Sequence, residues 1–284
     1  MIRLASYNIQ YGKGKDGRFD LDRIAGEIRG ADLIALQEVE TFAERSEMLD
    51  QVNGLAERLA PLHWVFGPGL DLDAATPEQP GRRRRYGNMV LSRWPILSAT
   101  NHMLPKVGLA DQFSQRRALL ETVIAVEGRP IRFMSVHFDH VGPDTRLPQI
   151  DAALRIIADG AVEGGAVSGL PVPGVPAVPM PRETILMGDF NFTPHCIEYE
   201  HMLGRTVGRH GRLIREAGLA DAWTVCGNGE FEGVSFPGDE PKRIDHCFLT
   251  PSLRPALRRM WIDEAAQGSD HQPIFVEMDL ATLA

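Results

Sequence analysis

Short apolar runs, bounded by Gly, Pro, Asn and Asp, recur along most of the chain. Runs of this length, rich in Val, Ile, Leu and Phe, are typical of buried β-strands. Amphipathic stretches lie between some of them, and this alternation predicts an α/β protein. Strands are predicted at residues 3–9, 33–37, 89–92, 118–126, 131–138, 184–188, 244–250 and 274–278.

Three stretches carry apolar residues at helical spacing instead. Residues 21–28 repeat them at i, i+3, i+4 and i+7, directly after Asp20, a residue type that caps helix N-termini. Residues 147–157 form a second stripe, with Pro148 expected in the first helical turn, where proline is tolerated. Residues 47–60 form a third. We therefore expect three helices in the first 160 residues.

The connections also carry information. A four-residue turn joins 118–126 to 131–138, which predicts a β-hairpin and hence a mixed sheet. Residues 67–86, 160–182 and 227–242 are predicted to be irregular, and the prolines of the middle segment cannot donate to a central sheet ladder. We find no repeat and no boundary, so a single domain over residues 1–284 is expected.

Composition narrows the functional classes. Hydrophobic residues make up 43% and charged residues 24%, which excludes disorder, collagen and coiled coil. The formal net charge is −8, which weakens the case for binding nucleic acid through nonspecific phosphate contacts. The N-terminal residues lack a signal-peptide pattern, no apolar run is long enough to span a membrane, and three cysteines lack metal or disulfide spacing. We expect a cytoplasmic location.

Polar residues occur where the predicted strands end or begin. Asn8, Glu38, His137 and Asp189 close strands, whereas Asp245 and the pair Asp270-His271 stand at or just before the start of later ones. The start of one antiparallel strand lies beside the end of its neighbour, so all of these groups can meet at one sheet edge. That edge is the predicted site.

The residue types at this edge indicate a hard cation. Asn8, Glu38, Asp189, Asn191 and Asp270 are oxygen donors, which suit Mg²⁺ or Mn²⁺ rather than zinc. Asp189 and Asn191 are two residues apart, so they share one face of an extended segment. One of the two can activate a water molecule while the other orients it.

Two histidines complete the predicted site. His271 follows Asp270, and a carboxylate such as Asp245 can hold its second ring nitrogen, which makes it a positioned acid or base. His137 supplies another imidazole for phosphate charge. Together, these groups are suited to the hydrolysis of a phosphate ester.

Five segments, taken in order, resemble motifs of the endonuclease/exonuclease/phosphatase superfamily, whose members hydrolyse phosphoesters with a divalent metal. They are Ser6-Tyr7-Asn8-Ile9, Leu36-Gln37-Glu38-Val39, Gly188-Asp189-Phe190-Asn191, Arg243-Ile244-Asp245-His246 and Gly268-Ser269-Asp270-His271. The resemblance covers residues from about 3 to 278. It implies a four-layer α/β sandwich, in which two packed mixed β-sheets are flanked by helices.

The resemblance also implies roles at matching positions. Glu38 is the principal ligand of Mg²⁺ or Mn²⁺, supported by Asn8 and Asp270. Asp189 activates or aligns the attacking water, and Asn191 orients that water or binds the phosphate.

The remaining roles concern the phosphate. Asp245 pairs with His271, which stabilises the phosphoryl oxygens, and His137 matches the histidine of the superfamily's nucleases and sphingomyelinases. Asn88 follows a Tyr-Gly pair that is similar to the family's Gly-Asn strand entry, and it is a substrate candidate.

Arginines and one further histidine are candidates for substrate contact. Arg117 and His140 lie near the predicted site in the sequence, although a strand flank and a turn also explain them. Residues 82–85 are four consecutive arginines, which favour a solvated loop and could also guide a polyanion.

The leading hypothesis is a metal-dependent phosphodiesterase that acts on a small-molecule or lipid-like phosphoester. A DNA or RNA nuclease is the alternative, supported by the arginine run, so nucleic acid stays a possible partner. A pseudoenzyme that only binds phosphate ligands is disfavoured, because no expected catalytic position is lost. No protein partner is inferred.

Overall fold

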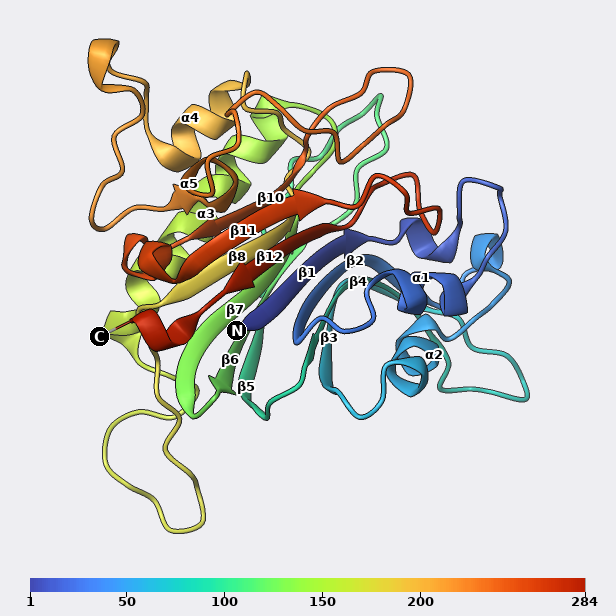
Figure 1. Cartoon of the computed structure of the whole chain (residues 1–284). Coiled ribbons are helices and arrows are strands. Elements are labelled where there is room, and N and C mark those ends of the chain that lie inside the picture. The colour runs from blue at the N-terminus through green and yellow to red at the C-terminus, as the bar shows by residue number, and fades with distance from the viewer. Residues whose placement is uncertain (284) are drawn as a thin grey trace.

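Two six-stranded mixed β-sheets face each other in the computed structural model, which describes residues 1–283 (Figure 1). The first sheet has the order β11 (Leu257–Ile262), β12 (Ile274–Met278), β1 (Ile2–Asn8), β2 (Leu33–Thr41), β4 (Arg83–Ser92) and β3 (His63–Asp73). The second has the order β5 (Ile96–Met103), β6 (Ala118–Val126), β7 (Arg129–His137), β8 (Thr184–Asp189), β10 (Asp245–Leu249) and β9 (Ala220–Asp221). In each sheet one central pair is parallel, β1 with β2 and β7 with β8.

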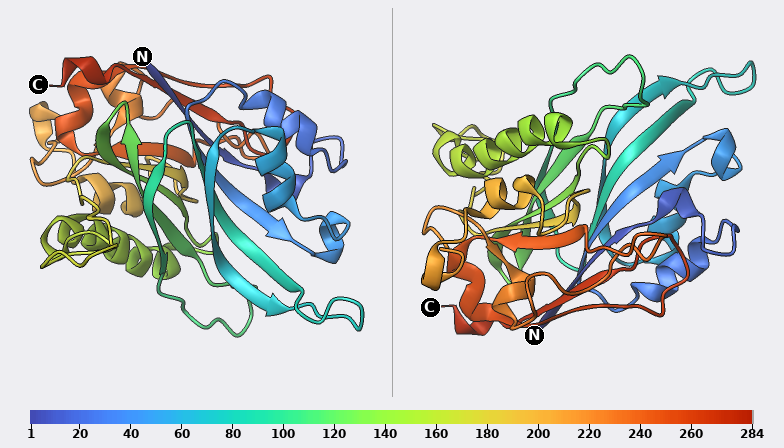
Figure 2. Two further views of the ribbon diagram at one scale, coloured as in Figure 1. Left: turned by 90° about the horizontal axis from the view of Figure 1, so that it is seen from below. Right: turned by 90° about the horizontal axis from the view of Figure 1, so that it is seen from above.

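Helices cover the outer faces of both sheets and complete four layers (Figure 2). They are α1 (Leu21–Glu27), α2 (Gln51–Arg58), α3 (Pro143–Glu163), α4 (Ile197–Leu203) and the single turn α5 (Ala222–Val225). One hydrophobic cluster lies between the sheets, a second joins the first sheet to α1 and α2, and a third joins the second sheet to α3 and α4. The four-layer sandwich expected from the sequence is therefore confirmed.

The predicted elements are present with shifted ends. All eight predicted strands form, as do the hairpin of β6 and β7 and the three helices. Asp20 caps α1 by accepting from the backbone N–H of Arg23 at 2.9 Å. Pro148 was misplaced, because α3 begins at Pro143 and Pro148 therefore lies beyond its first turn.

The prediction of an irregular segment at residues 67–86 is wrong for 67–73 and 83–86, which belong to β3 and β4, and is confirmed for 74–82. The glycines of β3 reflect close packing and not a loop. A Cβ at Gly67 would overlap the side chain of Asn101 in β5 of the second sheet. A Cβ at Gly69 would overlap the carbonyl oxygen of Arg116, just before β6 of the same sheet. The glycines thus let the edge of the first sheet approach its neighbour.

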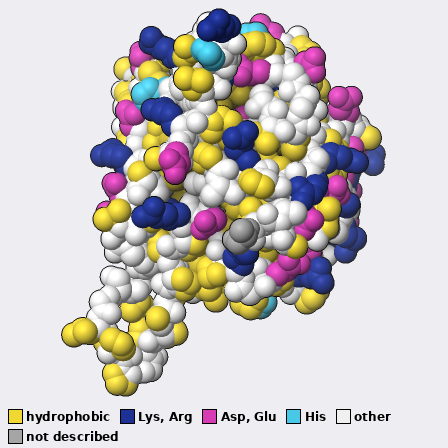
Figure 3. All heavy atoms as spheres, turned by 60° about the vertical axis from the view of Figure 1, so that its left-hand side comes forward, with side chains coloured by type: hydrophobic (Ala, Val, Ile, Leu, Met, Phe, Trp, Pro, Cys, Tyr) yellow, Lys and Arg dark blue, Asp and Glu magenta, His cyan; other side chains and the backbone are white. Residues whose placement is uncertain are grey.

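The other two irregular segments are confirmed, except that α3 extends to Glu163. Residues 164–180 contain no charged residue and protrude from the body of the molecule (Figures 1 and 3). Strands β5 and β11 and helix α4 were not predicted, since their half-exposed sequences lack a clear apolar period.

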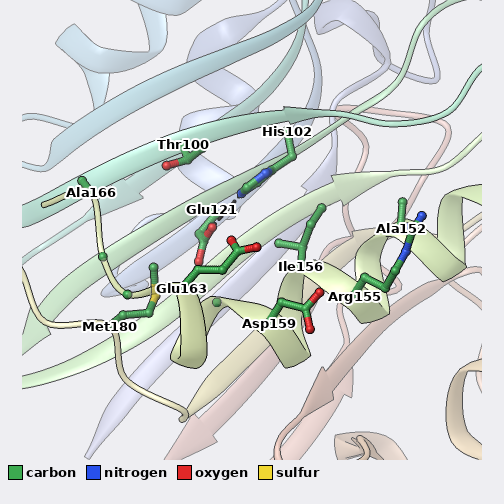
Figure 4. Close-up of a pocket in the computed structure, with 13 residues that line it drawn as sticks. Thr100, His102, Glu121, Ala152, Arg155, Ile156, Asp159, Glu163, Ala166 and Met180 are labelled. Atoms are coloured by element: carbon green, nitrogen blue, oxygen red, sulfur yellow. Dashed lines mark hydrogen bonds and ion pairs between the residues drawn. The ribbon is translucent and has the colours of Figure 1, made fainter. Parts of the chain in front are cut away.

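A buried ion pair between β6 and β7 lies beside a cavity of about 400 Å³, whose lining includes Glu121 and His102 (Figure 4). The Arg132 Nε donates to Glu121 at 2.7 Å, and His102 lies 2.7 Å from the other oxygen of that carboxylate. Arg132 also donates to the carbonyl oxygens of Ile156 and Ile157, each at 2.9 Å. The charges of this network are satisfied within the protein, so it serves the fold.

Candidate active site

Strand alternation places the candidate residues at one end of the layer between the sheets. Side chains two residues apart share a face, so Asn8 lies on the same face of β1 as the core residue Leu4. His137, Asp189 and Asp245 likewise continue the inward-facing core positions of β7, β8 and β10. The site is the polar end of the inter-sheet core.

Register brings three of these side chains together. In the parallel pair β7–β8, His137 lies opposite Asp189, and in the antiparallel pair β8–β10, Asp245 lies opposite the same residue. Gly188 has φ 153°, and a Cβ there would overlap the carbonyl oxygen of Val136 on β7. Only glycine therefore lets β8 approach closely enough to set Asp189 beside His137.

Asp189 is the hub of the hydrogen bonds. Its Oδ2 accepts from the Asn8 amide at 2.9 Å and lies 3.3 Å from the His137 Nε2. Its Oδ1 accepts from the backbone N–H of Asn191 at 2.9 Å, and Asn191 itself has φ 55°. Burial, with a further contribution from the nearby Asp245 carboxylate, raises the pKa of Asp189 to about 7. A carboxylate poised near neutrality is suited to accept a proton.

Asp245 and His271 form a buried dyad. The His271 Nδ1 lies 2.8 Å from the Asp245 Oδ2, and its Nε2 lies 3.7 Å from the Asp189 Oδ2. Burial alone lowers the pKa of His271, but the charges of Asp245 and Asp189 outweigh burial and raise it to about 10. The imidazole is therefore protonated at neutral pH, and its Nε2–H faces the Asp189 carboxylate and the Asn8 amide.

His137 is held in the opposite state. The Arg117 Nη1 lies 3.0 Å from the His137 Nδ1, and because a guanidinium can only donate, Nδ1 must accept. Burial first, and then the Arg117 charge, lowers the pKa of His137 well below its usual value. His137 is thus neutral, with its proton on Nε2 facing Asp189. Arg117 is buried, and its Nη2 lies 3.4 Å from the His140 Nδ1.

The metal-ligand candidates lie at the mouth of this cluster. Glu38 has φ 60° at a β-bulge between Leu36 and Val39, and its Oε1 accepts from the Asn8 amide at 3.1 Å. The Ser269 hydroxyl, 3.2 Å from the Asp270 Oδ1, joins Asp270 to the backbone carbonyl of Asn8.

The donor chemistry at the mouth fits a hard divalent cation. Glu38 and Asp270 are only half-buried, so an ion held there keeps access to water and substrate. Their oxygens match the preference of Mg²⁺ or Mn²⁺. The Asn8 amide oxygen accepts from the backbone N–H of Gln10 at 3.1 Å, and the Asn8 amide nitrogen faces Glu38. Within residues 1–283 no group of three or more His, Cys, Asp or Glu side chains is placed to hold a metal ion.

Two predicted contacts serve packing as well. The Asn88 amide nitrogen donates across the sheets to the carbonyl oxygens of Ala118 and Ser135, at 2.8 and 3.3 Å. The Asn191 amide nitrogen donates to the carbonyl oxygen of Phe138 at 3.1 Å. Both asparagines therefore fix the walls of the site.

Sequence reasoning missed Ser235 and Phe236, which belong to an irregular segment. The buried Ser235 hydroxyl accepts from the backbone N–H groups of Ile244 and Asp245 at 3.1 and 3.0 Å. The Phe236 ring packs edge-on against His271, with centroids 5.0 Å apart. No spacing rule connects residue 235 to a strand ten residues later, so the sequence carried no signal for this contact.

Ser235→Ala should loosen the Asp245–His271 dyad without removing it. Because two buried N–H groups lose their acceptor, we expect a destabilisation of about 1–3 kcal/mol, and kcat should fall more than KM rises. Ser235→Thr keeps the hydroxyl and is the matched variant. A normal kcat in a folded Ser235→Ala protein would show that this hydroxyl does not position the dyad.

Comparison with known proteins agrees with this geometry. The chain belongs to the endonuclease/exonuclease/phosphatase family, whose model matches residues 5–271. No curated protein matches the sequence significantly.

Solved structures share the fold at low sequence identity. An endonuclease/exonuclease/phosphatase from Beutenbergia cavernae is 22% identical, with a TM-score of 0.65 over 98% of this chain and 71% of that chain. A Bacteroides vulgatus family member is 18% identical, with a TM-score of 0.68 over 98% of both chains. A mannosyl-6-phosphatase from Bacteroides thetaiotaomicron is 18% identical, with a TM-score of 0.65 over 98% of this chain and 100% of that chain. At these identities the likeness establishes the fold alone.

Proposed function

We propose that this protein is a divalent-metal-dependent phosphodiesterase that acts on a small-molecule or lipid-like phosphoester. One observation carries the proposal. A carboxylate poised near neutrality, Asp189, lies between a neutral imidazole and a protonated one, beside an open oxygen-ligand set. Members of the family are hydrolases of phosphoesters and generally use divalent metals, which supports both the proposed hydrolysis and the proposed metal dependence.

The protein's residues divide the chemistry between them. Glu38 and Asp270 would hold the cation, which supplies Lewis-acid polarisation of the phosphate when bound. Asp189 takes a proton from the attacking water while the oxygen of that water bonds to phosphorus. The P–O bond to the ester group breaks, and the departing oxygen takes a proton from solvent. The backbone N–H of Asn191 keeps Asp189 oriented for that transfer.

Charge that develops on the phosphoryl group is met by fixed donors. His271, held protonated by Asp245, donates from Nε2 to a phosphoryl oxygen. His137 and Arg117 stabilise the same group from the second sheet. Preorganised donors of this kind supply a large share of catalysis in a site that excludes water.

The substrate class rests on the surroundings of the site. The chain is acidic overall, and Arg83 and Arg85 lie on the outer, helix-covered face of β4, away from the inward-facing Asn88. This placement turns these two arginines away from the candidate active site, whereas Arg84 shares the inner face of β4 with Asn88. No helix in residues 1–283 has the length and apolarity to cross a bilayer.

A substrate panel tests the proposal. Purified protein with Mg²⁺ or Mn²⁺ should cleave bis(p-nitrophenyl) phosphate faster than p-nitrophenyl phosphate and should lose activity in EDTA. Sphingomyelin, plasmid DNA and RNA complete the panel. Cleavage of nucleic acid alone would overturn the proposed substrate class, and preference for the monoester would overturn the diesterase assignment.

A further inference from the structure

We propose that Gln51 is a positioning residue for the divalent-cation site, because its buried amide fixes the two backbone segments that carry Asn8 and Glu38. These segments are residues 8–12, at the end of β1, and residues 38–41, in the neighbouring parallel strand β2. Gln51 is the first residue of α2, and its side chain is fully buried. The inference rests on the metal dependence proposed above and concerns a residue that is not itself a ligand.

The amide of Gln51 bonds one backbone group in each segment. Its Oε1 accepts from the backbone N–H of Glu40 at 3.0 Å, and its Nε2 donates to the backbone carbonyl of Tyr11. Gly12 has φ 86°, and a Cβ there would lie only 3.1 Å from the Gln51 Nε2, so glycine leaves room for this contact. An amide carries one acceptor and one donor side by side, which neither a carboxylate nor an apolar side chain offers.

These bonds close a ring of contacts at the mouth of the candidate active site. The Asn8 amide nitrogen donates to Glu38 at 3.1 Å, and the Asn8 Oδ1 accepts from the backbone N–H of Gln10 at 3.1 Å. Gln51 joins the residue that follows Gln10 to the residue two positions beyond Glu38, which completes the ring. A shift of either segment therefore moves Asn8 and Glu38 relative to each other.

The backbone in and beside both segments is strained. Eight non-glycine residues of the described chain have positive φ, and six of them lie between residues 10 and 48. With φ from 43° to 60°, they are Gln10, Tyr11, Glu38, Phe42, Glu47 and Met48. Such conformations persist only where surrounding contacts hold them. We therefore expect the segments to relax when the bonds of Gln51 are removed.

Arg45 makes a second bridge between the same two residues that Gln51 joins. Its Nε and Nη2 donate to the buried Glu40 carboxylate at 3.1 and 2.8 Å. Its guanidinium lies 4.1 Å from the centroid of the Tyr11 ring. The Arg45 side chain is 42% exposed, so it can be altered with less disturbance of the core than Gln51.

Helix α2 gives Gln51 a fixed position. Asp50 caps the helix by accepting from the backbone N–H of Asn53 at 3.2 Å. Val52 and Leu55 pack in the hydrophobic cluster between the helix and the first sheet. A side chain at the start of a capped and docked helix holds its partners more rigidly than one on a loop.

Direct binding of Mn²⁺ to the whole chain, without substrate, tests the role of Gln51. Electron paramagnetic resonance of the free ion gives the Kd. Gln51→Met should raise this Kd by about tenfold or more, since loss of a residue that orients metal ligands typically costs about 10- to 100-fold in affinity. Glu38→Gln should abolish the binding, which places the ion at this site.

Gln149→Met is the matched control. Gln149 is also buried, its Oε1 accepts from the backbone N–H of Asp139 at 2.8 Å, and its Nε2 donates to the carbonyl oxygen of Pro105 at 3.0 Å. It thus joins two backbone segments that carry no proposed metal ligand. Gln149→Met should leave the Kd for Mn²⁺ within about twofold of wild type, because only an outer partner of a ligand affects the metal. Thermal unfolding verifies that each variant is folded.

An unchanged Kd in folded Gln51→Met, or an equal rise in Gln149→Met, would overturn the proposed role. If Gln51→Met does not fold, Arg45→Lys replaces it, since it keeps the charge but loses the fork and the stacking. Arg45→Lys should raise the Kd by about threefold or more, and an unchanged Kd would then overturn the proposal. A Kd raised in Gln51→Met alone, in a protein that cleaves no phosphoester, would support the role of Gln51 and overturn the proposed function. Absence of Mn²⁺ binding by the wild type would overturn both.

Discussion

Asp189→Asn lowers kcat for the best phosphoester substrate by about 10² to 10³-fold, the typical cost of losing one preorganised group. The amide keeps the shape of the carboxylate but cannot accept a proton from water. Its fold should survive. Burial raises the pKa of Asp189 above its unfolded value, so ionisation of this group costs stability as pH rises through about 7. The neutral amide avoids that cost, and its Tm at pH 8 should equal or exceed that of wild type.

Steady-state kinetics with Mg²⁺ or Mn²⁺, together with thermal unfolding, check this expectation. Asp159→Asn is the matched control, because Asp159 is an exposed aspartate on α3, away from the catalytic edge. It should leave kcat unchanged. Near-normal turnover of Asp189→Asn would remove Asp189 from the proposed chemistry, even if the protein proves to be a phosphodiesterase.

The second large effect concerns stability. Arg132→Met should reduce the free energy of unfolding by about 3–5 kcal/mol, because it leaves the buried Glu121 carboxylate with His102 as its only charged partner. It also releases the carbonyl oxygens of α3 that Arg132 holds. Chemical denaturation measures the loss.

Replacing both Arg132 and Glu121 distinguishes the cost of an unpaired buried charge from the cost of lost packing. Arg132→Met/Glu121→Leu replaces the pair by apolar groups and should recover much of the loss, since the uncompensated charge is gone. The wild-type pair also has a defined pH dependence. Hydrogen bonds and the charges of His102 and Arg132 outweigh burial and lower the pKa of Glu121 below its unfolded value. The pair therefore stabilises the protein at neutral pH, and this stabilisation disappears as pH falls through the folded-state pKa. A double variant no more stable than the single variant would assign the loss to packing alone.

The sequence was informative where one physical rule dominated. Apolar runs predict buried central strands such as β1 and β8, and the polar residues that end those runs predict the sheet edge at which the structure brings them together. At β3 the sequence predicted an irregular segment, because the glycines that close contact between the sheets requires are also typical of loops. The Ser235 contact depends on tertiary docking of an irregular segment, which no local pattern encodes.

The burial of Arg117 was equally invisible, because an arginine beside a strand is usually solvated. Only the approach of His137 and His140 from β7 and its following turn shows what the guanidinium does. Side chains whose role depends on several elements are the ones that a sequence pattern cannot assign.

The site contains residues that are far apart in the sequence. The Asn8 amide nitrogen, on β1, lies 3.5 Å from the Nε2 of His271, which comes just before β12. β12 pairs with β1 in the middle of the first sheet, between β1 and β11. A growing polypeptide therefore cannot assemble the candidate active site until β12 has left the ribosome and paired with β1. Enzymatic turnover should accordingly appear only after this closing step, which makes activity a direct reporter of completed folding.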